Sequence, residues 1–135
     1  MSMKITQIKG NQFRAEYKGV EVISGNVTSN SQYVGMSPGS LMVASLGMCT
    51  GMHVRNYLDK NNIEHSGIEI SVKNKYERNP TRVGEFTLTV SIDGELTEEQ
   101  KIGVTEEAKL CYVGNTMKGG PQINVVFADE TELNS

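Results

Sequence analysis

The 135-residue sequence has no tryptophan, and aromatic residues make up only 6% of it. It has no apolar run long enough to cross a bilayer, and its first residues lack the apolar core of a signal peptide. Positive charge is scarce as well, because the formal net charge is −3 and no Lys/Arg cluster offsets it. These absences argue against a membrane protein and against a nucleic-acid-binding protein. We therefore expect a cytoplasmic protein.

Cysteine is also rare, with only Cys49 and Cys111, which stand 62 positions apart. Thiols are kept reduced in the cytosol, so a permanent disulfide is not expected there. The spacing fits neither a zinc motif nor a thioredoxin-type motif. His53 and His65 have no third ligand at a suitable distance along the chain, so we expect no metal and no cofactor.

The content of 37% hydrophobic and 21% charged residues is typical of a globular chain, and its length fits one domain spanning residues 1–135. Its main feature is a predicted helix from 38 to about 60. Ser37 can cap this helix and Pro38 suits its first position. Its first half is apolar on nearly every side, which predicts a buried helix. The small residues Ala44, Gly47 and Gly51 predict close contact with another helix, either of this chain or of a second copy.

Alternating apolar and polar residues predict strands before and after this helix. A capping box from Thr97 to Gln100 predicts the start of a second helix, and a break near Cys111 precedes a short third one. The resulting order is β-β-β-α-β-β-α-α-β, an α+β fold with an antiparallel sheet. The shorter strands are expected over 5–9, 12–17, 20–24 and 122–127, and the two longer ones around 68–73 and 86–92.

The residues alone leave the role of the thiols open. A buried cysteine usually packs as a small hydrophobic residue. A reactive cysteine must instead be a thiolate, which needs positive charge or amide dipoles nearby. His53 follows Cys49 by four residues and lies on the same helix face, and Arg14 is another candidate cation. Either one can equally be structural, His53 as a hydrogen-bonded histidine and Arg14 as a solvated charge.

Two stretches resemble the OsmC/Ohr family, in its general OsmC-like branch. The first runs from Pro38 through Ala44-Ser-Leu-Gly-Met-Cys49 to Arg55, and the second comprises 93–100 and 111–117. The resemblance extends over essentially the whole chain. It implies an OsmC-like fold and an intertwined homodimer with two active sites at the interface, each holding two cysteines.

The resemblance also implies an activity, the thiol-dependent reduction of organic hydroperoxides in oxidative stress defence. Cys49 would be the peroxidatic cysteine that becomes a sulfenic acid, and Cys111 would resolve it to a disulfide. An external dithiol would then reduce the disulfide. The family uses an arginine from its N-terminal strands to hold the thiolate, and Arg14 is the nearest match. Apart from the resemblance, we infer that His53 can partly substitute as the local cation. The expected substrate pocket comprises Met36, Met42, Met48, Met52 and Tyr112.

The chain departs from the family pattern at a few positions. Active peroxidases of the family carry an acidic residue one or two positions after the proline, where this chain has Gly39 and Ser40. Tyr112 stands where a proline usually follows the second cysteine. These differences and the methionines leave two alternatives open. One is a protein that binds a small hydrophobic ligand in a Met-lined pocket, and the other is a thiol redox sensor without peroxidase activity.

Overall fold

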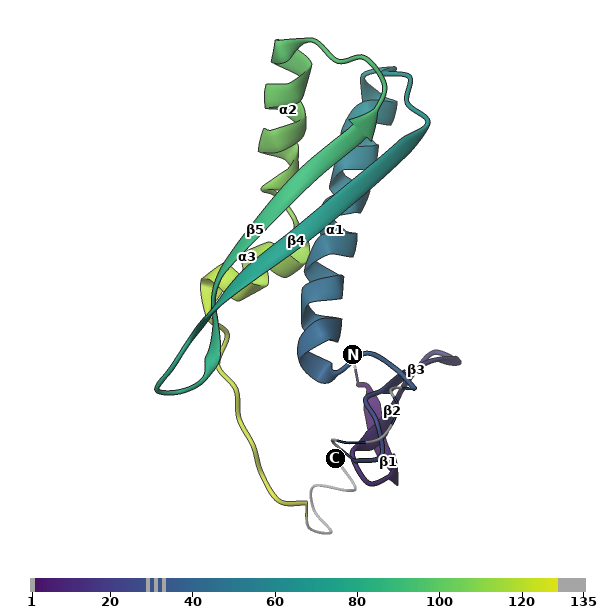
Figure 1. Ribbon diagram of the computed structural model, residues 1–135, viewed down its shortest axis with the longest axis vertical. Helices are drawn as coiled ribbons and strands as arrows, with labels where there is room; N and C mark the ends of the chain where they lie inside the picture. The colour runs from purple at the N-terminus through teal and green to yellow at the C-terminus, as the bar shows by residue number, and fades with distance from the viewer. Residues whose placement is uncertain (1, 29, 31, 33, 129–135) are drawn as a thin grey trace.

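The computed structural model describes residues 2–28, 30, 32 and 34–128, and it has the predicted α+β order up to the last strand. A three-stranded meander comes first, followed by a long helix, a two-stranded hairpin and two shorter helices (Figure 1). The elements are β1 (Lys4–Lys9), β2 (Gln12–Tyr17), β3 (Val20–Ser24), α1 (Pro38–Lys60), β4 (Gly67–Glu77), β5 (Arg82–Asp93), α2 (Glu98–Ala108) and α3 (Tyr112–Gly119).

The strands form two antiparallel sheets rather than the one sheet we expected. The first has the order β1-β2-β3, and the second pairs β4 with β5 in a register that places Ile70 opposite Val90. The β4–β5 hairpin lies along α1, whereas the three-stranded sheet lies beyond the first turn of α1 (Figure 1). Alternation along β4 and β5 turns one apolar face toward the helices, where Ile68, Ile70, Val90 and Ile92 pack against the core.

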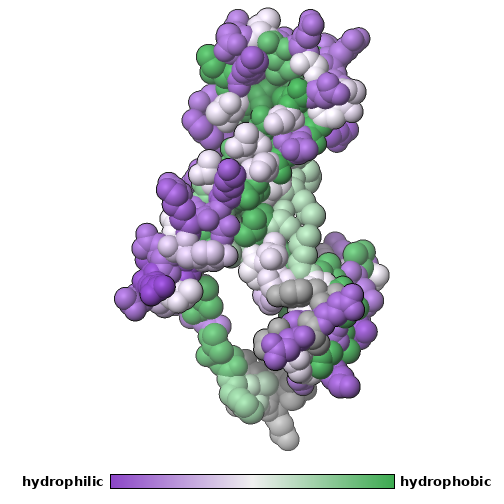
Figure 2. All heavy atoms as spheres, viewed as in Figure 1, coloured by the Kyte–Doolittle hydropathy of each residue, from purple (hydrophilic) through white to green (hydrophobic). Residues whose placement is uncertain are grey.

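The predicted last strand over 122–127 is wrong for the single chain. Residues 121–128 have no regular secondary structure, and the side chains of Val125 and Phe127 are 90% and 97% exposed. Figure 2 shows apolar side chains along this segment, which trails away from the helices toward the three-stranded sheet. A strand needs a neighbour for its backbone hydrogen bonds, and none of the sheets in the described part of the chain includes this segment.

Helix α1 begins and ends as predicted. The Ser37 hydroxyl accepts a hydrogen bond from the Ser40 amide at 3.1 Å, and Pro38 is the first helical residue. Only one side of the helix is buried within the chain, however, whereas Met48 and Met52 are 69% and 66% exposed. The expected burial on all sides is therefore wrong for a single chain. The buried side consists of Leu46, Thr50, Val54 and Leu58.

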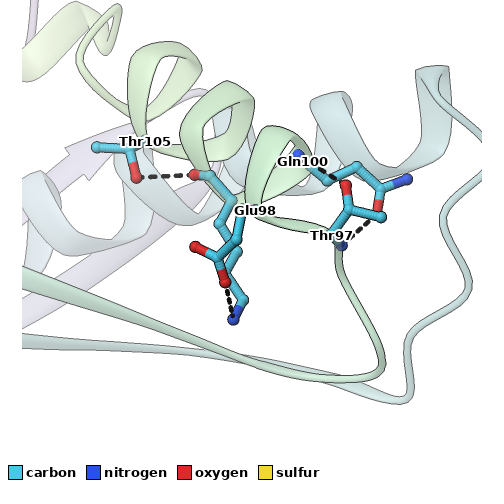
Figure 3. A network of polar contacts seen from close by, with 5 residues as sticks. Thr97, Glu98, Gln100 and Thr105 are labelled. Carbon is cyan, nitrogen blue, oxygen red and sulfur yellow. Dashed lines mark hydrogen bonds and ion pairs between the residues drawn. The ribbon is translucent and has the colours of Figure 1, made fainter.

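Helix α2 begins at the predicted capping box. The Thr97 hydroxyl accepts from the Gln100 amide, and the Gln100 side chain accepts from the Thr97 amide in return (Figure 3). Val104 joins Val54, Leu58 and Ile63 in the core, which fixes α2 against α1. The chain then breaks and turns into α3, as predicted. Among the described residues, no helix combines the length and the apolar character needed to cross a membrane.

Candidate functional site

The fold brings Cys49 and Cys111 together. Cys49 lies in the middle of α1 and is half-buried, whereas Cys111 precedes α3 and is only 2% exposed. Their side chains are hydrogen-bonded to each other, and both thiols are free. A pair so far apart in sequence meets because α3 packs across α1, where Gly114 faces Leu46.

Cys111 is the N-cap residue of α3. Its backbone is extended (φ −69°, ψ 133°), and its sulfur accepts a hydrogen bond from the Gly114 amide at 3.2 Å. Its carbonyl oxygen accepts the first helical bond, from the Asn115 amide at 2.9 Å. An N-cap side chain faces the free amides and the positive end of the helix dipole. Here that acceptor is sulfur in place of the usual oxygen.

This environment acts on the pKa of the Cys111 thiol in two directions. Burial is the largest single effect and raises the pKa. Hydrogen bonds from the Gly114 amide, the Cys49 and Thr50 side chains and the Val113 amide lower it, and together they hold the pKa below its usual value. Each of these donors stabilises the charged sulfur more than the neutral one. None of them is a cation.

His53 lies one turn after Cys49 and contacts α2. Its Nδ1 is 3.7 Å from Glu107 Oε1, which is ion-pair range but too long for a hydrogen bond. Both side chains are about a third exposed, so the pair adds little to stability. It does hold the imidazole between the two helices. Glu107 is therefore an acid near the site that the sequence did not single out.

Arg14 lies on β2, away from the cysteines. Its Nε is 3.1 Å from Glu21 Oε2, an ion pair without the alignment of a hydrogen bond. At the rise of an α-helix, Cys49 lies about 17 Å along α1 from Pro38, and the sheet that carries Arg14 lies beyond that end (Figure 1). One chain therefore does not bring Arg14 to the thiols.

The four methionines of the expected pocket line two hollows along α1. Met36 and Met42 line one of about 400 Å³, together with Tyr76 and Val83. Met48 and Met52 line the other, a groove of about 550 Å³ beside β4. The two hollows share Val43 and Ala44.

Neither hollow is lined by Cys49, Cys111 or Tyr112, and Tyr112 is 78% exposed. The methionines and the thiols are thus not joined in one pocket within the chain.

The contacts of Thr50 and the Gly114 amide with Cys111 were not predicted from the sequence. Only the positions of these two residues in the sequence could have indicated the contacts. Thr50 directly follows Cys49, and Gly114 is the third residue of the helix that Cys111 caps. Within the described ranges, no group of three or more His, Cys, Asp or Glu side chains could hold a metal ion.

Comparison with known proteins identifies the family of this chain and finds solved structures with the same fold. Residues 28–126 match the model of the family described as OsmC-like protein. No curated protein matches the chain. Solved structures do, among them a protein from Psychrobacter arcticus named for osmotic stress and a detoxification response, with 20% identity and a TM-score of 0.76 over 86% of this chain and 87% of that one.

Two further structures have the same fold. An OsmC-like protein from Mycoplasma pneumoniae is 15% identical, with a TM-score of 0.75 over 88% of this chain and 87% of that one. The organic hydroperoxide resistance protein OhrB of Bacillus subtilis is 21% identical, with a TM-score of 0.61 over 89% of this chain and 93% of that one. At such identities the likeness establishes the fold and no more.

Proposed function

Because this chain belongs to the OsmC-like protein family, we propose that it is a thiol-dependent peroxidase that reduces organic hydroperoxides. The observation that carries the proposal is the hydrogen-bonded pair of free thiols, Cys49 and Cys111. A pair in contact can close a disulfide with little movement of the backbone. The organic hydroperoxide resistance proteins among the structural relatives agree with this choice of substrate class.

In this proposal Cys49 attacks the peroxide, because it is the more exposed of the two thiols. Its sulfur takes the distal oxygen of the peroxide and becomes a sulfenic acid, while the O–O bond breaks and an alkoxide leaves. Cys111 then attacks the Cys49 sulfur, which forms the disulfide and releases hydroxide. An external dithiol restores both thiols by exchange.

We further propose that the protein acts in the cytoplasm as a homodimer. The exposed apolar side of α1, with Met48 and Met52, is a surface that a second copy could bury. A second copy is also the means by which Arg14 could approach Cys49, since one chain keeps them apart. Arg14 and His53 would then be the cations of the site.

The test is peroxide consumption by the reduced protein with cumene hydroperoxide and a dithiol. Cys49→Ser should abolish turnover. Ser45→Ala is the matched control, because Ser45 is exposed on α1 one turn before Cys49 and bonds only within the helix, to the Met42 carbonyl. If Cys49→Ser consumes peroxide as fast as the wild type, the peroxidase mechanism is wrong.

One observation favours a second function, the binding of a small hydrophobic ligand. The groove beside β4 is mostly apolar, and Gly47, Met48, Gly51 and Met52 are among the residues that line it. The chain also has Gly39 and Ser40 where active peroxidases carry their acid. Native mass spectrometry that finds a bound ligand, together with thiols that do not react with peroxide, would favour this function over the first.

A further inference from the structure

A contact between α1 and α2 lies one helical turn from the cysteine pair. Nδ1 of His53 on α1 is 3.7 Å from Oε1 of Glu107 on α2. This nitrogen is buried, and it has no hydrogen-bond partner among the described residues. A buried polar atom without a partner costs free energy, so such atoms are rare in folded proteins and often have a chemical role. The pair of His53 and Glu107 gives little stability in return, because both side chains are about a third exposed.

Three contacts of α1 follow one another at intervals of one helical turn. They pair Cys49 with Cys111, His53 with Glu107 and Tyr57 with Gly103. Each step of four residues forward along α1 is matched by a step of four residues back along the chain from Cys111 into α2. The two helices therefore run antiparallel in a fixed register, and His53 and Glu107 form the row next to the cysteine pair.

The geometry of an α-helix turns His53 toward Cys49. Residues four apart on a helix are neighbours, with Cβ atoms about 5–6 Å apart. Helical side chains also lean toward the N-terminus of their helix, which is the direction of Cys49 from His53. A carboxylate beside Nδ1 favours the tautomer with its proton on Nδ1, so Nε2 is the atom that can accept a proton. In the part of the chain that the structure describes, Glu107 is the one carboxylate within ion-pair distance of His53. The other titratable groups in the three rows are Cys49, Tyr57 and Cys111.

We propose that His53 is the base that takes the proton of Cys49, and that Glu107 is the positioning residue that orients His53 and balances its charge. A nucleophile, a base and an acid that orients the base are the usual means of activating a thiol. The use of this activation against peroxide rests on the function proposed above, whereas the activation of Cys49 does not. The 3.7 Å separation does not oppose the proposal, because hydrogen bonds of catalytic groups are often long before substrate binds.

The proton and the charge balance through the cycle. His53 takes the Cys49 proton, and the Cys49 sulfur bonds to the distal peroxide oxygen as the O–O bond breaks. The alkoxide that leaves takes the proton back from the imidazolium and becomes the alcohol. The Cys111 thiol then attacks the Cys49 sulfenic acid, the S–S bond forms, and the Cys111 proton leaves with the hydroxide as water. The peroxide gains the two electrons that the two sulfurs lose, and the external dithiol restores both thiols.

The activation of Cys49 can be tested without any peroxide. In a Cys111→Ser background Cys49 is the only thiol of the chain, and serine is a good N-cap residue for α3. Iodoacetamide alkylates the thiolate, so its rate reports how far Cys49 is activated. Glu107→Gln keeps the shape of the side chain and removes its charge, and we expect it to slow alkylation at neutral pH by about tenfold or more.

The neighbouring residue offers a matched control. Glu106→Gln makes the same change of charge one residue away, where the side chain is exposed and pairs with Lys109 at 3.1 Å. Alkylation of Glu106→Gln should match that of the parent, with all three proteins melting cooperatively. The difference between the two variants should vanish near pH 10, because a free thiol ionises without a base above about pH 8.5. Equal rates at neutral pH, or a difference that persists at pH ~10, would overturn the proposal.

A double-mutant cycle tests whether Glu107 acts through His53. His53→Gln should slow alkylation at least as much as Glu107→Gln does. The double variant should be no slower than His53→Gln alone, because a positioning residue has no effect once the residue that it positions is gone. Losses that multiply in the double variant would show that Glu107 acts on Cys49 by another route, and would contradict the proposal.

Peroxide separates this proposal from the proposed function. With cumene hydroperoxide and both cysteines in place, Glu107→Gln should reduce the rate of peroxide consumption by about the factor seen in alkylation, and Glu106→Gln should not. If wild type consumes peroxide and Glu107→Gln is as fast, His53 and Glu107 have no part in the reaction, whereas the peroxidase function stands. If wild type consumes no peroxide although alkylation depends on Glu107, the peroxidase function fails and the activation of Cys49 stands.

Discussion

Tyr57 of α1 lies against Gly103 of α2 so closely that a Cβ on Gly103 would overlap the tyrosine ring. We expect Gly103→Ala to lower the free energy of unfolding by about 1–3 kcal/mol, because the ring must move at the contact that holds the two helices together. This loss should occur although alanine is the better helix former by about 1 kcal/mol.

Gly39→Ala is the matched control for this prediction, because Gly39 also lies in a helix and nothing would contact its Cβ within 4 Å. Urea unfolding should show Gly39→Ala as neutral or slightly stabilised. Equal stability of the two variants would show that the Tyr57 contact does not constrain α2.

The lowered pKa of Cys111 predicts how stability depends on pH. The folded state stabilises the thiolate, so its contribution is full above the pKa of the unfolded thiol, about 8.5. That contribution is lost as the pH falls through the lower folded pKa. The free energy of unfolding of the reduced wild type should therefore rise between these two values relative to that of Cys111→Ser. A constant difference across this window would mean that Cys111 titrates alike in both states.

Local sequence signals predicted the helices well. Ser37 and Pro38 set the start of α1, the capping box set the start of α2, and the break before α3 was visible near Cys111. Each of these signals is a contact within a few residues, so it does not depend on the rest of the fold. The strand over 122–127 failed for the opposite reason, because its existence depends on a neighbour that the alternating pattern cannot supply.

The site was predictable only in part. The sequence resemblance named both cysteines, but only the packing of α3 on α1 shows that they touch. The N-cap role of Cys111 was missed for a different reason: its bond from the Gly114 amide spans only three residues, but a thiol is not among the usual N-cap side chains. The four methionines are close to Cys49 in the sequence, which led us to predict one shared pocket. In the structure, Met48 and Met52 instead line the groove beside β4.

The proposed homodimer predicts that a charged side chain in the groove beside β4 weakens dimerisation. Met52→Glu should weaken dimerisation by about a hundredfold in Kd or more, because it would bury a carboxylate in a groove whose one cation, Arg55, is already paired with Asp59. Ile102→Glu on α2 is the control, since Ile102 is 63% exposed and Met52 66%. Sedimentation at micromolar concentration should find a dimer for the wild type and Ile102→Glu, and monomer for Met52→Glu. A monomeric wild type would count heavily against the shared interface.

The last prediction concerns the segment 121–128. Ile123, Val125 and Phe127 are at least 83% exposed in one chain, and β1 and β3 are open edges of the first sheet. Exposed edges of this kind accept an additional strand, and an extended apolar segment is suited to supply it. We expect residues 122–127 to become a strand on dimerisation, as their alternating pattern predicts.

Amide hydrogen exchange checks this expectation. In the wild-type dimer the amides of residues 122–127 should exchange far more slowly than in monomeric Met52→Glu. The amides of β4 and β5 are the internal control, because these strands are already paired within one chain and should stay protected in both proteins. Rapid exchange of residues 122–127 in a confirmed dimer would contradict the prediction, because a segment with paired backbone amides cannot exchange at the rate of an open chain.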